Sequence, residues 1–336
     1  MGRGINLGNV LSAPEEGRWA PAATEQYFMD LAEANFTNVR IPMDFYGSRT
    51  SGDTSSYSTL ANTSADFTGS MDDFVVSSTY LDRIEEVVTW SLNQGLITVL
   101  DFHGSDLKTE FLHTFNSTNS DYLDPTSARR AADMTKFKSI WRAIATRFRD
   151  YAPELIFELV NEPYFELSAA EMDTLNSEVI PIIRASGGNN LYRNLVVVGG
   201  GENSYLAPQQ INPSILAGDA NLIATFHYYD PFKFTSSQRD QYDNNTWGTA
   251  DEILSVQTHF DSVKTWSDEQ EIPIYLGEFG ADNAKGFDYG SGTLRKINAN
   301  TSGFADGGPD LASRILYHQQ VAEEAISRGF AFSAWD

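Results

Sequence analysis

The sequence of 336 residues contains no cysteine, which excludes disulfide bonds, thiolate metal sites and cysteine nucleophiles together. Positive charge is also scarce, because 23 lysine and arginine residues stand against 46 aspartate and glutamate residues, for a net charge of −23. Such a surface repels phosphate backbones and anionic lipids, so we expect neither a nucleic acid nor a membrane as partner. A neutral polymer is not penalised by this negative field.

Long apolar runs and an N-terminal leader are lacking as well. No run approaches the roughly 18 residues that a membrane-spanning helix needs. Met1 leads almost directly into the segment Gly-Ile-Asn at 4–6, without the apolar stretch of a signal peptide. We therefore expect the printed chain to be a mature or recombinant form. Hydrophobic residues make up 41% of it, which is enough for a sizeable core.

Short apolar runs alternate with longer amphipathic segments along the chain. The predicted strands are Gly4–Asn9, Asn38–Pro42, Ile97–His103, Leu155–Glu162, Leu195–Gly199, Leu222–Tyr229, Ile274–Gly280 and Phe330–Trp335. The predicted helices are Ala22–Asn35, Thr79–Gln94, Ser127–Tyr151, Ser168–Ala185, Asp251–Glu269 and Asp310–Arg328, with a shorter one near Tyr205–Gln209. Several strands are continuously apolar, which is typical of a parallel sheet covered by helices.

Eight strands with intervening helices predict a single catalytic domain over residues 1–336, an α/β fold of the (β/α)8 TIM-barrel type. Helix-start signals support the pattern, since Thr24 precedes one helix and Ser168 with Glu171 has the spacing of a capping box. The chain is printed only to Asp336, just after the eighth strand. We therefore expect the eighth helix of the barrel to be absent from it.

Polar and aromatic residues are concentrated where the predicted strands end. They are Asn6, Asn9, Arg40, His103, Asn161, Glu162, His227, Tyr229, Glu278 and Trp335. In a TIM barrel the carboxyl ends of all strands meet at one face, where active sites form. We therefore expect these side chains to converge on one cleft. The long polar loops Phe45–Ser78, Asp230–Gly248 and Ala281–Gly308 would lie on the same rim, as cleft walls or as solvated insertions.

Glu162 and Glu278 are the candidates for a site with two carboxyl groups. Cleavage of a glycosidic bond needs one carboxyl that protonates the leaving oxygen and one that attacks the anomeric carbon or activates water. Asn-Glu-Pro at 161–163 ends a strand with a turn, and Gly-Glu-Phe-Gly at 277–280 leaves room for close approach. Arg40 would favour the ionised form of Glu278, while a nearby carboxylate would help to keep Glu162 protonated.

Seven segments, each at a predicted strand, resemble glycoside hydrolase family 5, the cellulase-rich family of clan A. They are GINLGN at 4–9, VRIP at 39–42, VLDFH at 99–103, NEP at 161–163, HYY at 227–229, LGEFG at 276–280 and WD at 335–336. The resemblance implies a (β/α)8 barrel and a retaining, two-step mechanism through a covalent glycosyl-enzyme. It implies that Glu162 is the acid/base and Glu278 the nucleophile.

The same resemblance implies roles for supporting residues and requires no cofactor. Asn161 would hold the 2-hydroxyl of the reacting sugar, Arg40 and Tyr229 would orient Glu278, His103 and His227 would line the cleft, and Trp335 would form its floor. The family often has a second histidine where this chain has Gly104. We expect this difference to alter sugar contacts and to leave the chemistry intact.

Other residues are assigned by weighing binding against packing. Sugar rings stack on aromatic faces, and we favour this role for Trp19 and Tyr205 over the packing expected of Phe45, Tyr46, Tyr164, Phe232 and Trp247. We expect Glu158 and Asp101 to be buried and paired with other polar groups, and Glu202 to be an ordinary loop residue. His113, His259 and His318 are expected to pack against other side chains or to contact solvent. A calcium site at Asp282, Asp288 and Asp306 is the disfavoured interpretation of an acidic loop.

The combined expectation is a monomeric, extracellular endo-β-glucanase that acts on β-1,4 or mixed-linkage β-1,3/1,4-glucan. A β-mannanase or xyloglucanase on the same scaffold is the nearest alternative. A barrel that binds glycans without cutting them is a second one. A metal-dependent hydrolase that uses His103, His227 and the two glutamates as ligands is a third.

Overall fold

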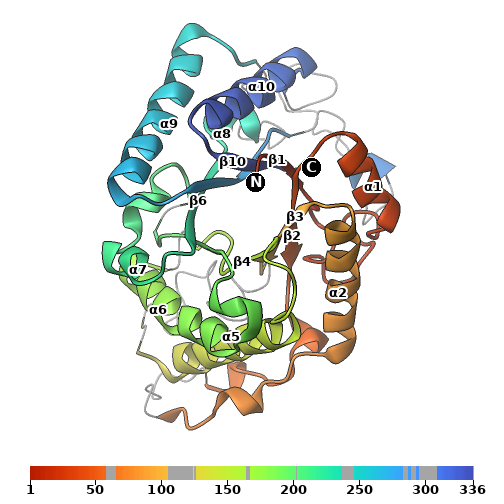
Figure 1. Ribbon diagram of the computed structural model, residues 1–336, viewed down its shortest axis with the longest axis vertical. Helices are drawn as coiled ribbons and strands as arrows, with labels where there is room; N and C mark the ends of the chain where they lie inside the picture. Colours follow the sequence, from red (N-terminus) through yellow and green to blue (C-terminus); the bar gives the residue numbers. More distant parts are fainter. Residues whose placement is uncertain are drawn as a thin grey trace.

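The computed structural model describes residues 1–57, 66–104, 124, 126–163, 167–201, 203–236, 246–282, 287–288, 293–294 and 309–335. Eight parallel strands close into a barrel in the order β1-β10-β7-β6-β5-β4-β3-β2. Helices surround the strands as an outer ring (Figure 1). The TIM barrel predicted from the sequence is therefore confirmed.

All eight predicted barrel strands are present; β2 is one residue longer than predicted, and the other seven are shorter. The strands are β1 (Arg3–Asn6), β2 (Asn38–Met43), β3 (Ile97–Phe102), β4 (Leu155–Glu158), β5 (Leu195–Val197), β6 (Leu222–Tyr228), β7 (Ile274–Phe279) and β10 (Ala331–Ala334). The largest difference is at β4, which ends at Glu158, so Asn161 and Glu162 stand in the loop that follows. A separate pair of two-residue strands, β8 (Phe287–Asp288) and β9 (Thr293–Leu294), lies outside the barrel.

The long helices match the amphipathic segments of the sequence. They are α1 (Glu25–Glu33), α2 (Ser78–Asn93), α5 (Ala128–Arg147), α6 (Ala169–Ala185), α9 (Ala250–Gln270) and α10 (Leu311–Ser327). Thr24 caps α1, and the capping box of Ser168 and Glu171 forms at α6 as expected. No helix in the described part of the chain is long and apolar enough to cross a membrane.

Short elements fill the segments that the sequence indicates as loops. The short helix predicted near Tyr205–Gln209 is the 3-10 helix η6 (Ala207–Gln210), while α7 (Pro213–Gly218) and α8 (Phe232–Thr235) were not predicted, because elements of six and four residues are too short to show a periodic pattern. The segment after β2 contains η1 (Gly47–Arg49), η2 (Ser55–Tyr57) and η4 (Met71–Asp73). An antiparallel β-bridge between Thr50 and Val76 joins the beginning and the end of this segment.

Side chains of the barrel strands alternate between two clusters. Val99, Ile156, Val196, Ile223 and Tyr275 form a small apolar cluster, and their strand neighbours pack into a larger cluster with the helices. Since Asp101 follows Val99 by two positions and Glu158 follows Ile156 by two, both acids lie on the same strand face as the small cluster, toward the carboxyl ends. A charged layer therefore sits inside the barrel next to an apolar one.

Trp141 gives a test of the packing between α5 and the barrel. Its side chain is fully buried against Phe102 and Phe157, and its Nε1 donates to the carbonyl oxygen of Leu159 at 3.1 Å. We expect Trp141→Ala to lower the free energy of unfolding by about 3–5 kcal/mol, measured by denaturant titration. Leu254→Ala, at a site that is 58% exposed, should stay within about 0.5 kcal/mol of the parent. Equal losses in both variants would contradict this assignment.

Candidate active site

The centre of the site is the fully buried guanidinium of Arg40 on β2. Its Nη1 lies 2.6 Å from Oε1 of Glu278 on β7. Its Nε and Nη2 donate to the two carboxylate oxygens of Glu158 on β4, at 2.7 and 3.0 Å, and Nη2 lies 2.9 Å from Oδ2 of Asp101 on β3. One cation thus joins three carboxyl groups from three other strands. Burial raises the pKa of Glu158, although Arg40 acts to lower it.

Two asparagines complete the shell of Arg40. Nη1 donates to Oδ1 of Asn6 at 3.0 Å, and Nη2 donates to Oδ1 of Asn161 at 2.8 Å. The amide of Asn6 also donates to the carbonyl oxygens of Gly277, Ser333 and Ala334. Because Asn6 is fully buried, it supports the site by linking β1 to β10 and β7, and it is not part of a cleft surface.

Glu162 and Glu278 approach one another through His227 on β6. The Nδ1 atom of His227 lies 2.7 Å from Oε1 of Glu162 and 3.6 Å from Oε2 of Glu278. The hydroxyl of Tyr229 donates to the same Oε2 of Glu278 at 2.9 Å. One oxygen of each glutamate and a nitrogen of His227 all lie within 4.8 Å of one another. The two carboxyl groups therefore lie close enough to face a single sugar bond.

A break in the strand register turns Glu278 toward this site. Phe226 pairs with Leu276, but the next residue, His227, pairs with Glu278, so Gly277 is an extra residue in β7. Such a bulge changes the side to which the following side chain points. A Cβ atom on Gly277 would lie 2.9 Å from Nε2 of His227, so only glycine lets the imidazole pack against the strand.

His103 and Trp335 form a second part of the site. Nδ1 of His103 lies 2.9 Å from Oδ2 of Asp101, and its ring stacks on Trp335 with centroids 5.4 Å apart and an interplanar angle of 18°. The same Nδ1 is 3.8 Å from Oε1 of Glu278. His103 and Trp335 are half-buried, so they border the exposed side of the carboxyl pair.

The two aromatic residues favoured as sugar platforms lie further out. Trp19 is half-buried in the loop after β1. The ring of Tyr205 stacks on His259 of α9, with centroids 3.8 Å apart and an interplanar angle of 7°, so one of its faces is covered. Their contribution to sugar binding stays a prediction.

The structure bears out the packing assignment for some of the remaining aromatic residues and not for others. Phe45 and Trp247 are buried, as packing residues should be, whereas Tyr46 and Phe232 are 45% and 39% exposed, so the packing assignment was wrong for these two. The reason is that loop segments near a rim can leave large rings uncovered, which composition does not reveal. Tyr164, Glu202, His113, Asp306 and the side chain of Asp288 lie outside the described residues.

The charges of the site determine which groups hold protons. Burial lowers the pKa of the His227 imidazole, but the negative charge of Glu278 and the hydrogen bond to Glu162 outweigh burial and raise the pKa above its ordinary value. Burial, together with the charge of Glu278, holds the pKa of Tyr229 well above its ordinary value, so this hydroxyl stays a donor. The site thus favours the protonated form of His227, which lies between two carboxyl groups.

A metal ion would have to compete with these hydrogen bonds. Within the described ranges, Glu162, His227 and Glu278 form a group whose donor atoms could hold a metal ion. However, Nδ1 of His227 is engaged with Glu162, and both oxygens of Glu278 are engaged with Arg40 and Tyr229. The donor set is therefore satisfied as a hydrogen-bonded acid pair.

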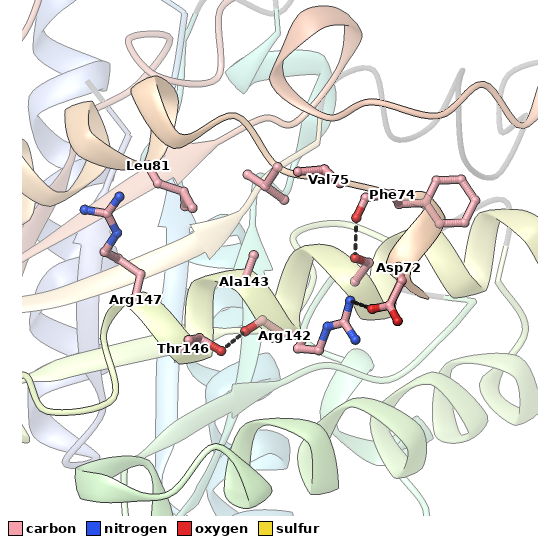
Figure 2. Close-up of a pocket in the computed structure, with 10 residues that line it drawn as sticks. Asp72, Phe74, Val75, Leu81, Arg142, Ala143, Thr146 and Arg147 are labelled. Carbon is pink, nitrogen blue, oxygen red and sulfur yellow. Dashed lines mark hydrogen bonds and ion pairs between the residues drawn. The ribbon is translucent and has the colours of Figure 1, made fainter. Parts of the chain in front are cut away.

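Two hollows lie elsewhere on the molecule. One, of about 430 Å³, is lined by the η4 segment, Leu81 of α2 and one face of α5 (Figure 2). Its charged groups are paired, since Arg142 binds Asp72 at 2.8 Å. The other, of about 620 Å³, lies at the amino ends of the strands and is mostly apolar. Neither hollow is lined by Glu162 or Glu278, so neither is the candidate active site.

Comparison with known proteins relates the chain to cellulases. A model of the cellulase family, glycosyl hydrolase family 5, matches residues 3–305. Endoglucanase H of Acetivibrio thermocellus is 34% identical over 100% of this chain and 29% of its own length. The cellulase/esterase CelE of the same organism is 27% identical over 99% of this chain and 35% of its own length. The chain thus spans about a third of these two relatives.

Solved structures resemble the whole described barrel. The cellulose synthase subunit Z of Clostridioides difficile has a TM-score of 0.74 and 26% identity, over 100% of this chain and 91% of that one. A tri-modular endo-β-1,4-glucanase of Bacillus licheniformis has a TM-score of 0.74 and 27% identity, over 100% of this chain and 54% of that one.

The raised pKa of His227 predicts that the stability of the fold depends on pH. Because the pKa of His227 is raised in the folded state, its stabilising contribution is complete below the ordinary value of about 6.5 and is lost as pH rises through the higher folded pKa. We expect the difference in unfolding free energy between the parent and His227→Asn to shrink as pH increases above about 6.5. Denaturant titrations over this range check it, and a difference that grows with pH contradicts it.

Proposed function

Because the chain belongs to glycosyl hydrolase family 5, we propose that it is a retaining endo-β-glucanase that cleaves β-1,4 or mixed-linkage β-1,3/1,4-glucan by double displacement. The observation that carries the proposal is the approach of Glu162 and Glu278, whose nearest donor oxygens lie within 4.8 Å. In this scheme Glu162 is the acid/base and Glu278 is the nucleophile.

The reaction proceeds in two steps. First, a carboxylate oxygen of Glu278 attacks the anomeric carbon, the bond to the leaving oxygen breaks, and the proton of Glu162 passes to that oxygen. Then a water molecule attacks the same carbon, Glu162 takes its proton, and the ester bond to Glu278 breaks. Two inversions give a product with the configuration of the substrate.

The neighbours of the glutamates suit these steps. Arg40 and Tyr229 donate to different oxygens of Glu278, so they fix its orientation and stabilise its charge both before attack and when it leaves as a carboxylate. Nδ1 of His227 lies 2.7 Å from Oε1 of Glu162, so His227 can stabilise the carboxylate that forms once Glu162 has given up its proton. Asn161, held by Arg40, is the proposed partner of the 2-hydroxyl group.

The choice of substrate follows from charge and from the relatives. A net charge of −23 disfavours anionic polymers and leaves a neutral glucan unaffected. The relatives named endoglucanase, at 34% identity in the first case, favour internal cleavage of a β-glucan. Since such polymers are too large to enter a cell, we propose that the protein acts outside it, as a monomer.

Substitution of the two glutamates tests the mechanism. We expect Glu278→Ala to lower kcat at least about 10⁴-fold, because the nucleophile is removed, and Glu162→Gln to lower it about 10²–10⁴-fold, because proton transfer is lost. The control is Glu178→Gln on α6, whose carboxylate pairs with Lys138 on the surface and should leave the rate at the parent value. Proton NMR during parental turnover should show the β-anomer as first product. Hydrolysis by Glu278→Ala at the parent rate, or the α-anomer first, refutes the scheme.

A panel of polysaccharides tests the substrate and the type of cleavage. We expect cellulose-type and mixed-linkage β-glucans to give oligosaccharides of several lengths, as sized by chromatography, and activity to be unchanged by EDTA. Products from mannan alone, or from xyloglucan alone, would replace the glucanase by the corresponding alternative. Binding without any product would favour a glycan-binding barrel, and loss of activity in EDTA would favour a metal-dependent hydrolase.

A further inference from the structure

Asp101 is a buried carboxylate that contacts the site without facing either glutamate of the pair directly. Its Oδ2 atom forms an ion pair with Nη2 of Arg40 at 2.9 Å and lies 2.9 Å from Nδ1 of His103, and its side chain is fully buried. Its other oxygen, Oδ1, is buried and makes no hydrogen bond within the described residues. One oxygen is therefore shared between the cation that holds Glu278 and a histidine at the open side of the site.

This sharing fixes where the proton of His103 lies. An ionised carboxylate can only accept hydrogen bonds, so the short contact to Asp101 requires a proton on Nδ1 of His103. In the neutral ring, Nε2 then has the lone pair and is an acceptor at the opposite edge of the imidazole. The stack of His103 on Trp335 holds the plane of the ring.

The same contact also keeps His103 away from the proposed nucleophile. Nδ1 of His103 lies only 3.8 Å from Oε1 of Glu278, which already accepts from Arg40 at 2.6 Å. Without Asp101, this N–H could turn to Glu278 and compete with Arg40. An additional donor on Glu278 would lower its nucleophilicity, because each hydrogen bond stabilises the resting carboxylate.

We propose that Asp101 is a positioning residue that holds His103 as the Nδ1-protonated tautomer, so that Nε2 accepts a hydrogen bond from a hydroxyl group of the sugar bound beside Trp335. The effect on sugar rests on the proposed function, whereas the tautomer is a property of the protein alone. The two parts are therefore measured separately.

The tautomer is read by ¹⁵N NMR of histidine-labelled protein. The chain has five histidines, so their signals can be resolved, and His103→Gln identifies the signals of His103. In the parent we expect a protonated Nδ1 and an unprotonated Nε2 on His103. In Asp101→Leu we expect this preference for Nδ1 to be lost, because no acceptor remains beside that nitrogen. A parent spectrum with a proton on Nε2 overturns the proposal without any use of substrate.

Activity is measured on the β-glucan that the parent cleaves best. We expect Asp101→Leu to lower kcat/KM about tenfold to 100-fold, by analogy with the loss of a partner that orients a metal-ligating histidine. We also expect the loss in the double variant Asp101→Leu/His103→Gln to be smaller than the product of the two separate losses, because part of each acts through the same ring. Full additivity of the two losses, or a changed tautomer with unchanged kcat/KM, rejects a role through His103.

A matched control separates positioning from folding. Asp133→Leu on α5 removes another buried carboxylate that accepts from an arginine, Arg129, and that has no histidine contact among the described residues. It should leave the signals of His103 and kcat/KM unchanged. Should the parent cleave no polysaccharide at all, the proposed function fails, while the NMR experiment still decides whether Asp101 sets the tautomer.

Discussion

The site depends on one buried cation. Arg40 is fully enclosed, and its guanidinium contacts acceptors from β1, β3, β4 and β7 as well as the loop after β4. A buried charge without partners is strongly unfavourable, and the closed barrel brings to Arg40 the acceptors that its burial requires. The same strand arrangement that closes the barrel therefore also assembles the carboxyl site.

The acceptors around Arg40 carry more negative charge than it can balance. Three carboxyl groups surround one guanidinium, and Glu162 stands just beyond them. The pKa of Glu158 is raised by its burial, and that of His227 is raised by Glu278 and Glu162. Both shifts favour retention of protons, at Glu158 chiefly because of burial and at His227 because of the neighbouring negative charges. A site that must supply one proton and recover it in each cycle gains from such a surplus of acceptors.

The sequence predicts the barrel well, since each strand and each long helix leaves a local pattern of burial. It also places the polar residues at the strand ends, because that rule follows from fold type. It does not predict the bulge at Gly277 that turns Glu278 inward, or the stack of Tyr205 on His259, because both depend on contacts between elements distant in the chain. Glu158 and Asp101 were correctly expected to be buried and hydrogen-bonded. Their common partner, Arg40, could have been suspected from charges placed on the inner face of buried strands.

In the proposed mechanism, different parts of the molecule carry the chemistry and the choice of sugar. Arg40, Glu158 and Asn6 are buried and contact other protein groups, so their arrangement would serve any β-linked sugar whose bond lies between the two glutamates. Groups that can distinguish one sugar from another must reach its hydroxyls or its ring faces, as His103 and Trp335 can from the open side. Asp101 is a point where the two parts meet, because the oxygen that holds Arg40 also orients His103. Substitutions further out on the rim can therefore change the preferred glucan without disturbing the buried cluster, whereas a change at Asp101 affects both.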